Sequence, residues 1–142
     1  MKRLRNQKGA ALLETAITLP LVLLVTVSIF EFGRAYQTWQ VLTNAAREGA
    51  RVAVLADATD AQVTTAVRTY MSTGQLPKAT TASVAIERAV PFGASSSASR
   101  ITVSYPFNFM VLNPVIRMVK PGSQTGQGTT TMVSVALMRN ES

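Results

Sequence analysis

The protein has 142 residues, enough for one domain of ordinary size and too few for two domains beside a membrane segment. It contains 14 Lys and Arg against 7 Asp and Glu, a formal net charge of +7, with no Cys and no His. The lack of Cys excludes disulfides and thiolate chemistry, and the lack of His removes the commonest general base near neutral pH and the commonest metal ligand. Nucleic acid is not an expected partner, because much of the excess positive charge is concentrated at the N-terminus.

The first thirty residues consist of a basic leader and an apolar run. Four Lys and Arg side chains lie within residues 2–8, and residues 10–30 contain few polar groups. As a helix, residues 10–30 would rise about 31 Å, close to the thickness of the hydrocarbon core of a bilayer. Cations on the N-terminal flank predict a cytoplasmic N-terminus and an extracytoplasmic remainder.

Three interpretations of this segment compete. A cleavable secretory signal would have a shorter apolar region and a small-x-small site after it, which residues 31–34 (Glu-Phe-Gly-Arg) do not supply. A plain signal anchor explains the length and the charges. It does not explain Glu14, because a carboxylate in a membrane helix costs a few kcal/mol unless it stays hydrated near the interface or has a partner.

The third interpretation is a processed subunit. Gly9, Ala10 and Glu14, placed after a basic leader and at the start of an apolar helix, resemble the processing site of type IV prepilins. The resemblance implies that a membrane aspartyl peptidase, the prepilin peptidase, cuts between Gly9 and Ala10, and that Glu14 becomes the fifth mature residue. Cleavage would remove the four cations and create an α-amino group on Ala10. The Glu14 of a neighbouring subunit would neutralise that amine among apolar helices.

Helical patterning continues from the apolar run to about residue 56. Opposite charges three residues apart, Glu31 with Arg34 and Glu48 with Arg51, predict ion pairs on the solvated side of this helix. Tyr36 and Trp39 also fit an interfacial aromatic belt just outside a membrane. We expect one apolar stripe to pack against the rest of the protein, formed by Phe32, Tyr36, Trp39, Leu42, Ala46, Ala50 and Ala53.

Three residues would weaken or bend this long helix. Pro20 removes one backbone hydrogen bond, and Thr15, Thr18 or a neighbouring helix would have to satisfy the freed carbonyl. Gly33 and Gly49 each cost about 1 kcal/mol relative to Ala. We interpret the glycines as sites of close helix contact or of local bending.

A family resemblance follows from residues 31–34 (Glu-Phe-Gly-Arg) and 44–51 (Asn-Ala-Ala-Arg-Glu-Gly-Ala-Arg). Together with the leader, these residues resemble the TadE-like family of tight-adherence pilus proteins, over residues 8–55. The resemblance implies a minor pilin or pseudopilin with an N-terminal membrane helix, a small exported domain and prepilin-peptidase processing. The implied partners are that peptidase, other pilins or pseudopilins of the same system, and the bacterial inner membrane.

The remainder of the chain predicts a second helix and about three strands. The helix, residues 61–72, would be capped by Asp60, ended by Gly74 and Pro77, and would have Val63, Val67, Tyr70 and Met71 on its apolar side. Alternating apolar and polar residues predict strands over residues 83–90, 100–107 and 130–139.

Two connections separate these strands. Pro91 and residues 93–99 are interpreted as the first. Residues 108–128 form the second, with an apolar first half (Phe109 to Val119) and a Gly/Ser/Gln-rich second half (residues 121–128). The apolar half is expected to pack on the sheet, or otherwise to be an exposed contact patch for a partner.

These observations predict an α+β, pilin-like fold, in which the strands are antiparallel and packed on a long N-terminal helix. Residues 1–9 would be the leader, residues 10–30 the transmembrane and polymerisation helix, and residues 31–142 the exported domain. The expected function is that of a structural subunit of a tight-adherence, type IV-like pilus. The alternative is a signal-anchored extracytoplasmic binding module that does not polymerise. We expect no enzymatic activity, catalytic residue, metal or cofactor, since no catalytic constellation is found.

Overall fold

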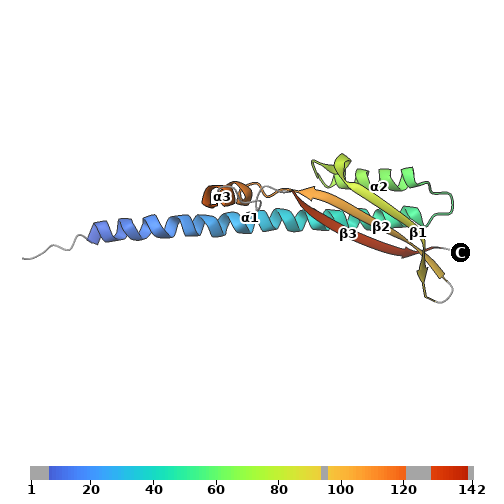
Figure 1. Cartoon of the computed structure of the whole chain (residues 1–142), viewed down its shortest axis with the longest axis horizontal. Coiled ribbons are helices and arrows are strands. Elements are labelled where there is room, and N and C mark those ends of the chain that lie inside the picture. The colour runs from blue at the N-terminus through green and yellow to red at the C-terminus, as the bar shows by residue number, and fades with distance from the viewer. Residues whose placement is uncertain (1–6, 94–95, 121–128, 141–142) are drawn as a thin grey trace, which may run out of the picture.

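The computed structural model describes residues 7–93, 96–120 and 129–140. Its first element, α1 (Gln7–Ala53), is one helix of 47 residues that continues through Pro20. At 1.5 Å per residue it is about 70 Å long. Figure 1 shows its N-terminal half projecting away from a small domain that is packed on its C-terminal half. Judged by length and composition, α1 is the one helix in the described part of the chain that could cross a membrane.

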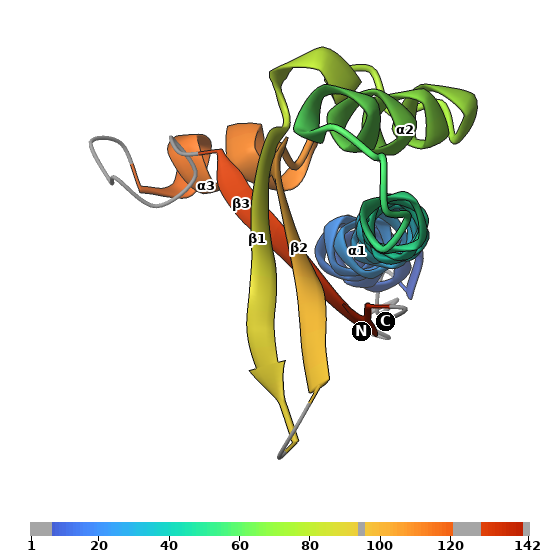
Figure 2. The ribbon, with the colours of Figure 1, turned by 90° about the vertical axis from the view of Figure 1, so that its right-hand side faces the viewer.

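The small domain combines α1 with a second helix and a three-stranded sheet. Both strand pairs of the sheet are antiparallel, in the order β1-β2-β3. α1 contacts β2, β3 and α2, an arrangement seen from the end in Figure 2. The expected α+β fold is thus confirmed. After α1 the elements are α2 (Asp60–Thr73), the 3-10 helix η1 (Ala79–Thr81), β1 (Ser83–Phe92), β2 (Ser96–Phe107), α3 (Leu112–Val119) and β3 (Thr130–Arg139).

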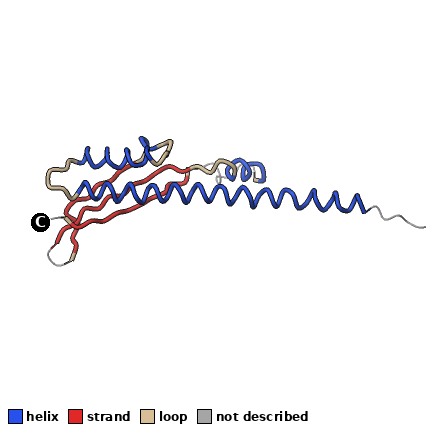
Figure 3. The backbone as a smooth tube through the Cα atoms, turned by 180° about the vertical axis from the view of Figure 1, so that it is seen from behind, coloured by secondary structure: helices blue, strands red, loops and turns tan. Residues whose placement is uncertain are grey.

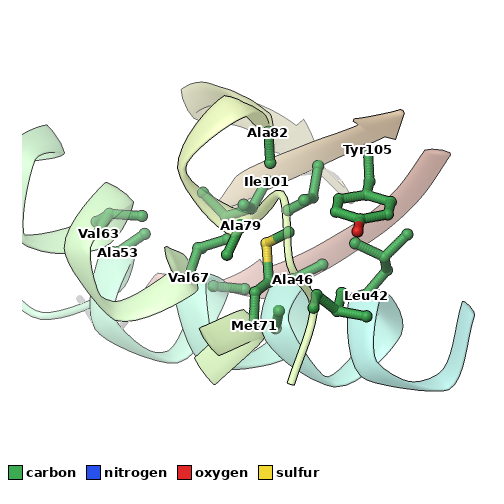
Figure 4. Packing of buried hydrophobic residues seen from close by; sticks show 14 of the residues in the cluster. Leu42, Ala46, Ala53, Val63, Val67, Met71, Ala79, Ala82, Ile101 and Tyr105 are labelled. Carbon is green, nitrogen blue, oxygen red and sulfur yellow. The ribbon is translucent and has the colours of Figure 1, made fainter. Parts of the chain in front are cut away.

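One apolar core joins the two helices to the sheet (Figure 4). Small side chains on α1 allow the close approach of its neighbours. A Cβ atom added to Gly49 would lie 2.5 Å from Val67 Cγ2 and 3.3 Å from Ile101 Cγ2, so this glycine permits close contact as expected, whereas Gly33 has no such neighbour within 4 Å. The core includes Leu42, Ala45, Ala46, Ala50 and Ala53 of α1, Val63, Val67 and Met71 of α2, and Ile101, Val103, Tyr105 and Phe107 of β2.

The predicted stripe of α1 is correct in its second half and wrong in its first. Phe32, Tyr36 and Trp39 are 63%, 62% and 47% exposed. The buried positions in this part of the helix are instead Glu31 and Thr38, one residue earlier in each case. A search for apolar periodicity cannot recognise a buried face that contains polar side chains. It therefore selected positions one residue later, which on a helix point about 100° away from the buried face.

The start of α2 is capped by Thr59 rather than by Asp60. Thr59 and Gln62 form a capping box, in which the Thr59 side chain accepts from Gln62 N and the Gln62 side chain accepts from Thr59 N at 2.9 Å. The expected apolar side is buried at Val63, Val67 and Met71, whereas Tyr70 is 39% exposed. Gly74 follows the last residue of α2 as its C-cap.

The first two strands are longer than predicted. β1 continues to Phe92 and β2 begins at Ser96, so Pro91 and most of the expected connection lie within the hairpin's strands. Proline is tolerated there because β1 is an edge strand of the sheet. A bulge between Glu87 and Val90, with Ala89 at a φ of 57°, interrupts the β1–β2 ladder.

The connection after β2 contains a helix that the sequence did not predict. Phe109 packs on the core, with its ring edge-on to Phe107 and the ring centroids 5.1 Å apart. α3 then lies beside α1, toward the N-terminus of α1 from the end of the sheet (Figures 1 and 3). The expectation that this segment packs on the sheet therefore holds for Phe109 and is wrong for α3. Eight helical residues are too few to reveal a helical period. The Gly/Ser/Gln-rich tract and the first six leader residues lie outside the described part of the chain.

Candidate processing and assembly helix

The N-terminal half of α1 presents apolar side chains on all its sides. Within residues 10–30 the exposed fractions of the exposed large apolar side chains range from 44% for Leu24 to 72% for Leu12. The described part of the chain does not cover them, and so much exposed apolar surface is unstable in water. This half of α1 needs lipid or other apolar helices around it.

The predicted processing residues lie at the start of this surface. Gly9 and Ala10 are exposed and helical, within the first turns of α1. The first turn of a helix has unpaired N–H groups and frays most easily, so the Gly9–Ala10 bond lies where local unwinding costs little.

Glu14 lies one helical turn after Ala10 and is exposed. Its backbone carbonyl accepts a hydrogen bond from Thr18 Oγ1 at 2.9 Å. Its carboxylate has no hydrogen bond or ion pair with any residue that the structure describes. Within one subunit, therefore, Glu14 adds a charge to an apolar surface and has no visible partner there.

The threonines near Pro20 do not compensate for it. Thr15 Oγ1 donates to Ala11 O and Thr18 Oγ1 donates to Glu14 O, both at 2.9 Å. The carbonyl freed by Pro20 is that of Ala16, four residues earlier. Of the two explanations proposed from the sequence, the threonine bond is therefore wrong, and a neighbouring helix stays a prediction.

The junction between the apolar run and the small domain contains a buried carboxylate. Glu31 is fully buried, so its expected position on the solvated side is wrong. Its Oε1 accepts hydrogen bonds from Met110 N and Val111 N, both at 2.9 Å. Arg34 Nη2 lies 3.7 Å from Glu31 Oε2, so the predicted pair exists as a loose contact.

Arg34 fixes the same junction from the other side. Its Nη2 donates to Asn108 O at 2.8 Å, and its guanidinium lies 5.1 Å from the centre of the Phe107 ring. Glu31 and Arg34 thus attach residues 108–111 to α1, and nothing in their i,i+3 spacing indicates this role. The one hint in the sequence is that Glu31 directly follows an apolar run, where a carboxylate that becomes buried needs hydrogen-bond partners.

The second predicted ion pair has the expected geometry. Arg51 Nε and Nη2 donate to the two carboxylate oxygens of Glu48 at 2.9 and 2.6 Å on the exposed side of α1. The hydrogen bonds from Arg51 lower the pKa of the Glu48 carboxyl. This pair supports the helix locally and points to no ligand.

Arg88 is a second residue whose role the sequence did not reveal. From β1 it donates to Asp60 Oδ1 at 2.9 Å, to Ala53 O at 3.0 Å and to Ala58 O at 2.8 Å. Ala53 is the last residue of α1, so Arg88 satisfies one of the unpaired carbonyls at that helix end. It joins β1 to the turn between the two helices.

These features define a class of protein: a small α+β domain attached to a long helix with a membrane-length apolar surface. Residues 9–51 match the family model described as TadE-like protein, which covers nearly all of α1. The match confirms the resemblance predicted from the sequence, and over that segment the chain is similar to the TadE-like proteins of tight-adherence pili. Members of that family are structural proteins, and the match together with the apolar helix indicates attachment to a membrane. No curated protein and no solved structure matches the chain.

Proposed function

We propose that the protein is a minor pilin or pseudopilin, a structural subunit used to assemble a tight-adherence pilus. The observation that carries the proposal is the Glu14 carboxylate on the exposed apolar half of α1, which has no partner among the residues that the structure describes. A single subunit leaves both the apolar surface and this charge unsatisfied, whereas a bundle of such helices buries the surface and offers a partner for the charge.

Processing creates that partner. The prepilin peptidase cuts between Gly9 and Ala10, which removes the leader cations and leaves an α-amino group on Ala10. The Glu14 carboxylate of one subunit then pairs with the Ala10 amine of its neighbour. Among apolar helices this pairing leaves neither charge buried without a partner. Removing one partner of a well-buried pair destabilises the assembly by about 3–5 kcal/mol.

Before assembly the subunit is held in the bacterial inner membrane by residues 10–30. The leader cations keep the N-terminus in the cytoplasm and place residues 31–142 outside it. A reporter fused after Ser142 that is active only outside the cytoplasm tests this orientation.

N-terminal sequencing of the protein from membranes and from sheared filaments tests the proposal. We expect the mature chain to begin at Ala10, and Gly9→Val to leave a longer precursor in the membrane. Ala11→Val changes a small residue that lies one position beyond the two residues of the cleaved bond, and it is the matched control. An uncleaved N-terminus in cells that contain the peptidase would refute the proposal and favour the signal-anchored binding module.

A further inference from the structure

The short helix α3 and the residues before it carry apolar side chains that the described chain leaves uncovered. Met110 is 65% exposed, Val111 is 37% exposed and Met118 is 82% exposed. Leu112, Val115 and Ile116 of α3 are half-buried. We refer to Met110, Val111 and α3 together as the collar.

The collar lies where the apolar run of α1 ends. α3 contacts α1 and lies beside it, on the N-terminal side of the sheet (Figures 1 and 3). Every residue of α1 from Ala10 to Thr26 is exposed, whereas Val27 and Ser28 are half-buried and Glu31 is fully buried. The collar therefore begins to cover α1 within the last residues of the predicted membrane span.

Hydrogen bonds to α1 fix the position of the collar. Both Met110 N and Val111 N donate to Glu31 Oε1 at 2.9 Å. Arg34 Nη2 donates to the carbonyl of Asn108, two residues before Met110. Because Glu31 directly follows the apolar run, these bonds set the collar at a defined height along α1.

We propose that the collar is a membrane-binding element, which enters the interfacial layer of the leaflet that faces the exported domain. Its exposed apolar side chains lie beside the end of the apolar run of residues 10–30, whose exposed surface needs lipid before assembly. Its eight-residue helix is about 12 Å long, and interfacial helices insert about 5–10 Å into the boundary between headgroups and acyl chains.

This assignment rests on the membrane span in the proposed function and goes beyond it. The span holds the subunit in the bilayer, whereas the collar sets the depth at which the exported domain lies. Glu31 is a positioning residue in this arrangement. A second copy of the chain is the competing occupant of the same surface.

Single tryptophan probes in the full chain distinguish lipid from other surroundings. Trp39 is the only native tryptophan, so Trp39→Phe provides the background. Met118→Trp probes the collar, Leu19→Trp probes the span, and Val133→Trp on the exposed outer side of β3 is the control, at 50% exposure. The protein is reconstituted in phosphatidylethanolamine and phosphatidylglycerol vesicles, with or without brominated acyl chains, and its fluorescence is also titrated with acrylamide.

We expect brominated lipid to reduce the fluorescence of the Leu19→Trp and Met118→Trp probes at least twofold and to leave the Val133→Trp probe nearly unchanged. A Met118→Trp probe that is quenched by acrylamide alone would face water. A probe that is quenched by neither agent would be covered by protein. Either result would overturn the proposal that the collar binds the membrane. Loss of lipid quenching at Leu19→Trp would instead overturn the membrane span of the proposed function. The two proposals therefore fail separately.

Discussion

Gly49 is the position where one methyl group should test the packing of the domain most directly. In Gly49→Ala the new Cβ would lie 2.5 Å from Val67 Cγ2 and 3.3 Å from Ile101 Cγ2. Both neighbours are fully buried β-branched side chains with little freedom to rotate away. Overpacking of this kind costs about 1–3 kcal/mol, against a gain of about 1 kcal/mol in helix propensity.

Gly33→Ala is the matched control. It makes the same change in the same helix, but no atom outside the helix backbone lies within 4 Å of the new Cβ. The propensity gain cancels between the two variants, so Gly49→Ala should be less stable than Gly33→Ala by about 1–3 kcal/mol. Chemical unfolding of the full chain in detergent micelles, followed by Trp39 fluorescence and circular dichroism, measures the difference. Equal stability of the two variants would mean that α2 and β2 do not approach α1 as closely as the structure has them.

Three further predictions concern other contacts. Glu14→Ala should reach the membrane at normal levels, because losing the charge eases insertion by up to about 3 kcal/mol. At matched membrane levels it should nevertheless give a low pilus yield, because the Ala10 amine of the neighbouring subunit loses its partner. A normal pilus yield would mean that Glu14 is only a hydrated interfacial carboxylate. Arg88→Ala should lower the free energy of unfolding by about 1–3 kcal/mol, whereas the control Arg100→Ala should lower it by less than about 1 kcal/mol. The two side chains are similarly exposed, at 37% and 40%, but among the described residues Arg100 pairs only with the exposed Glu87. Equal losses in denaturant titrations would contradict the role of Arg88. Thr59→Ala should cost about 0.5–2 kcal/mol in the same titrations by removing the capping box, and an unchanged midpoint would place the cap elsewhere.

The elements with a long or regular apolar pattern were predictable. The run of residues 10–30 and the positions after it required one long helix, and α1 extends from Gln7 to Ala53. Alternation over about eight residues was enough to locate all three strands, including β3 with both its ends. These predictions succeeded because burial of apolar side chains repeats with the period of the backbone.

The features that were missed depend on polar groups meeting across the fold. Glu31 and Arg88 use backbone carbonyls and amides that lie 30 to 80 residues away in the chain. Neither residue has a local pattern that distinguishes it from a solvated charge. A backbone group must have a partner when it is buried, and which side chain supplies it is decided only when the elements pack.

The burial of Glu31 also accounts for the aromatic residues that follow it. Turning Glu31 and Thr38 toward the domain turns Tyr36 and Trp39 outward, where their rings lie 6.2 Å apart and remain 62% and 47% exposed. Tyr and Trp side chains suit the boundary between lipid and water, because each combines an apolar ring with a polar group. The interfacial interpretation of these two residues therefore accounts for more of the structure than the core interpretation does. The collar is attached to α1 through the same Glu31 side chain, so both features follow from the burial of one carboxylate directly after the apolar run.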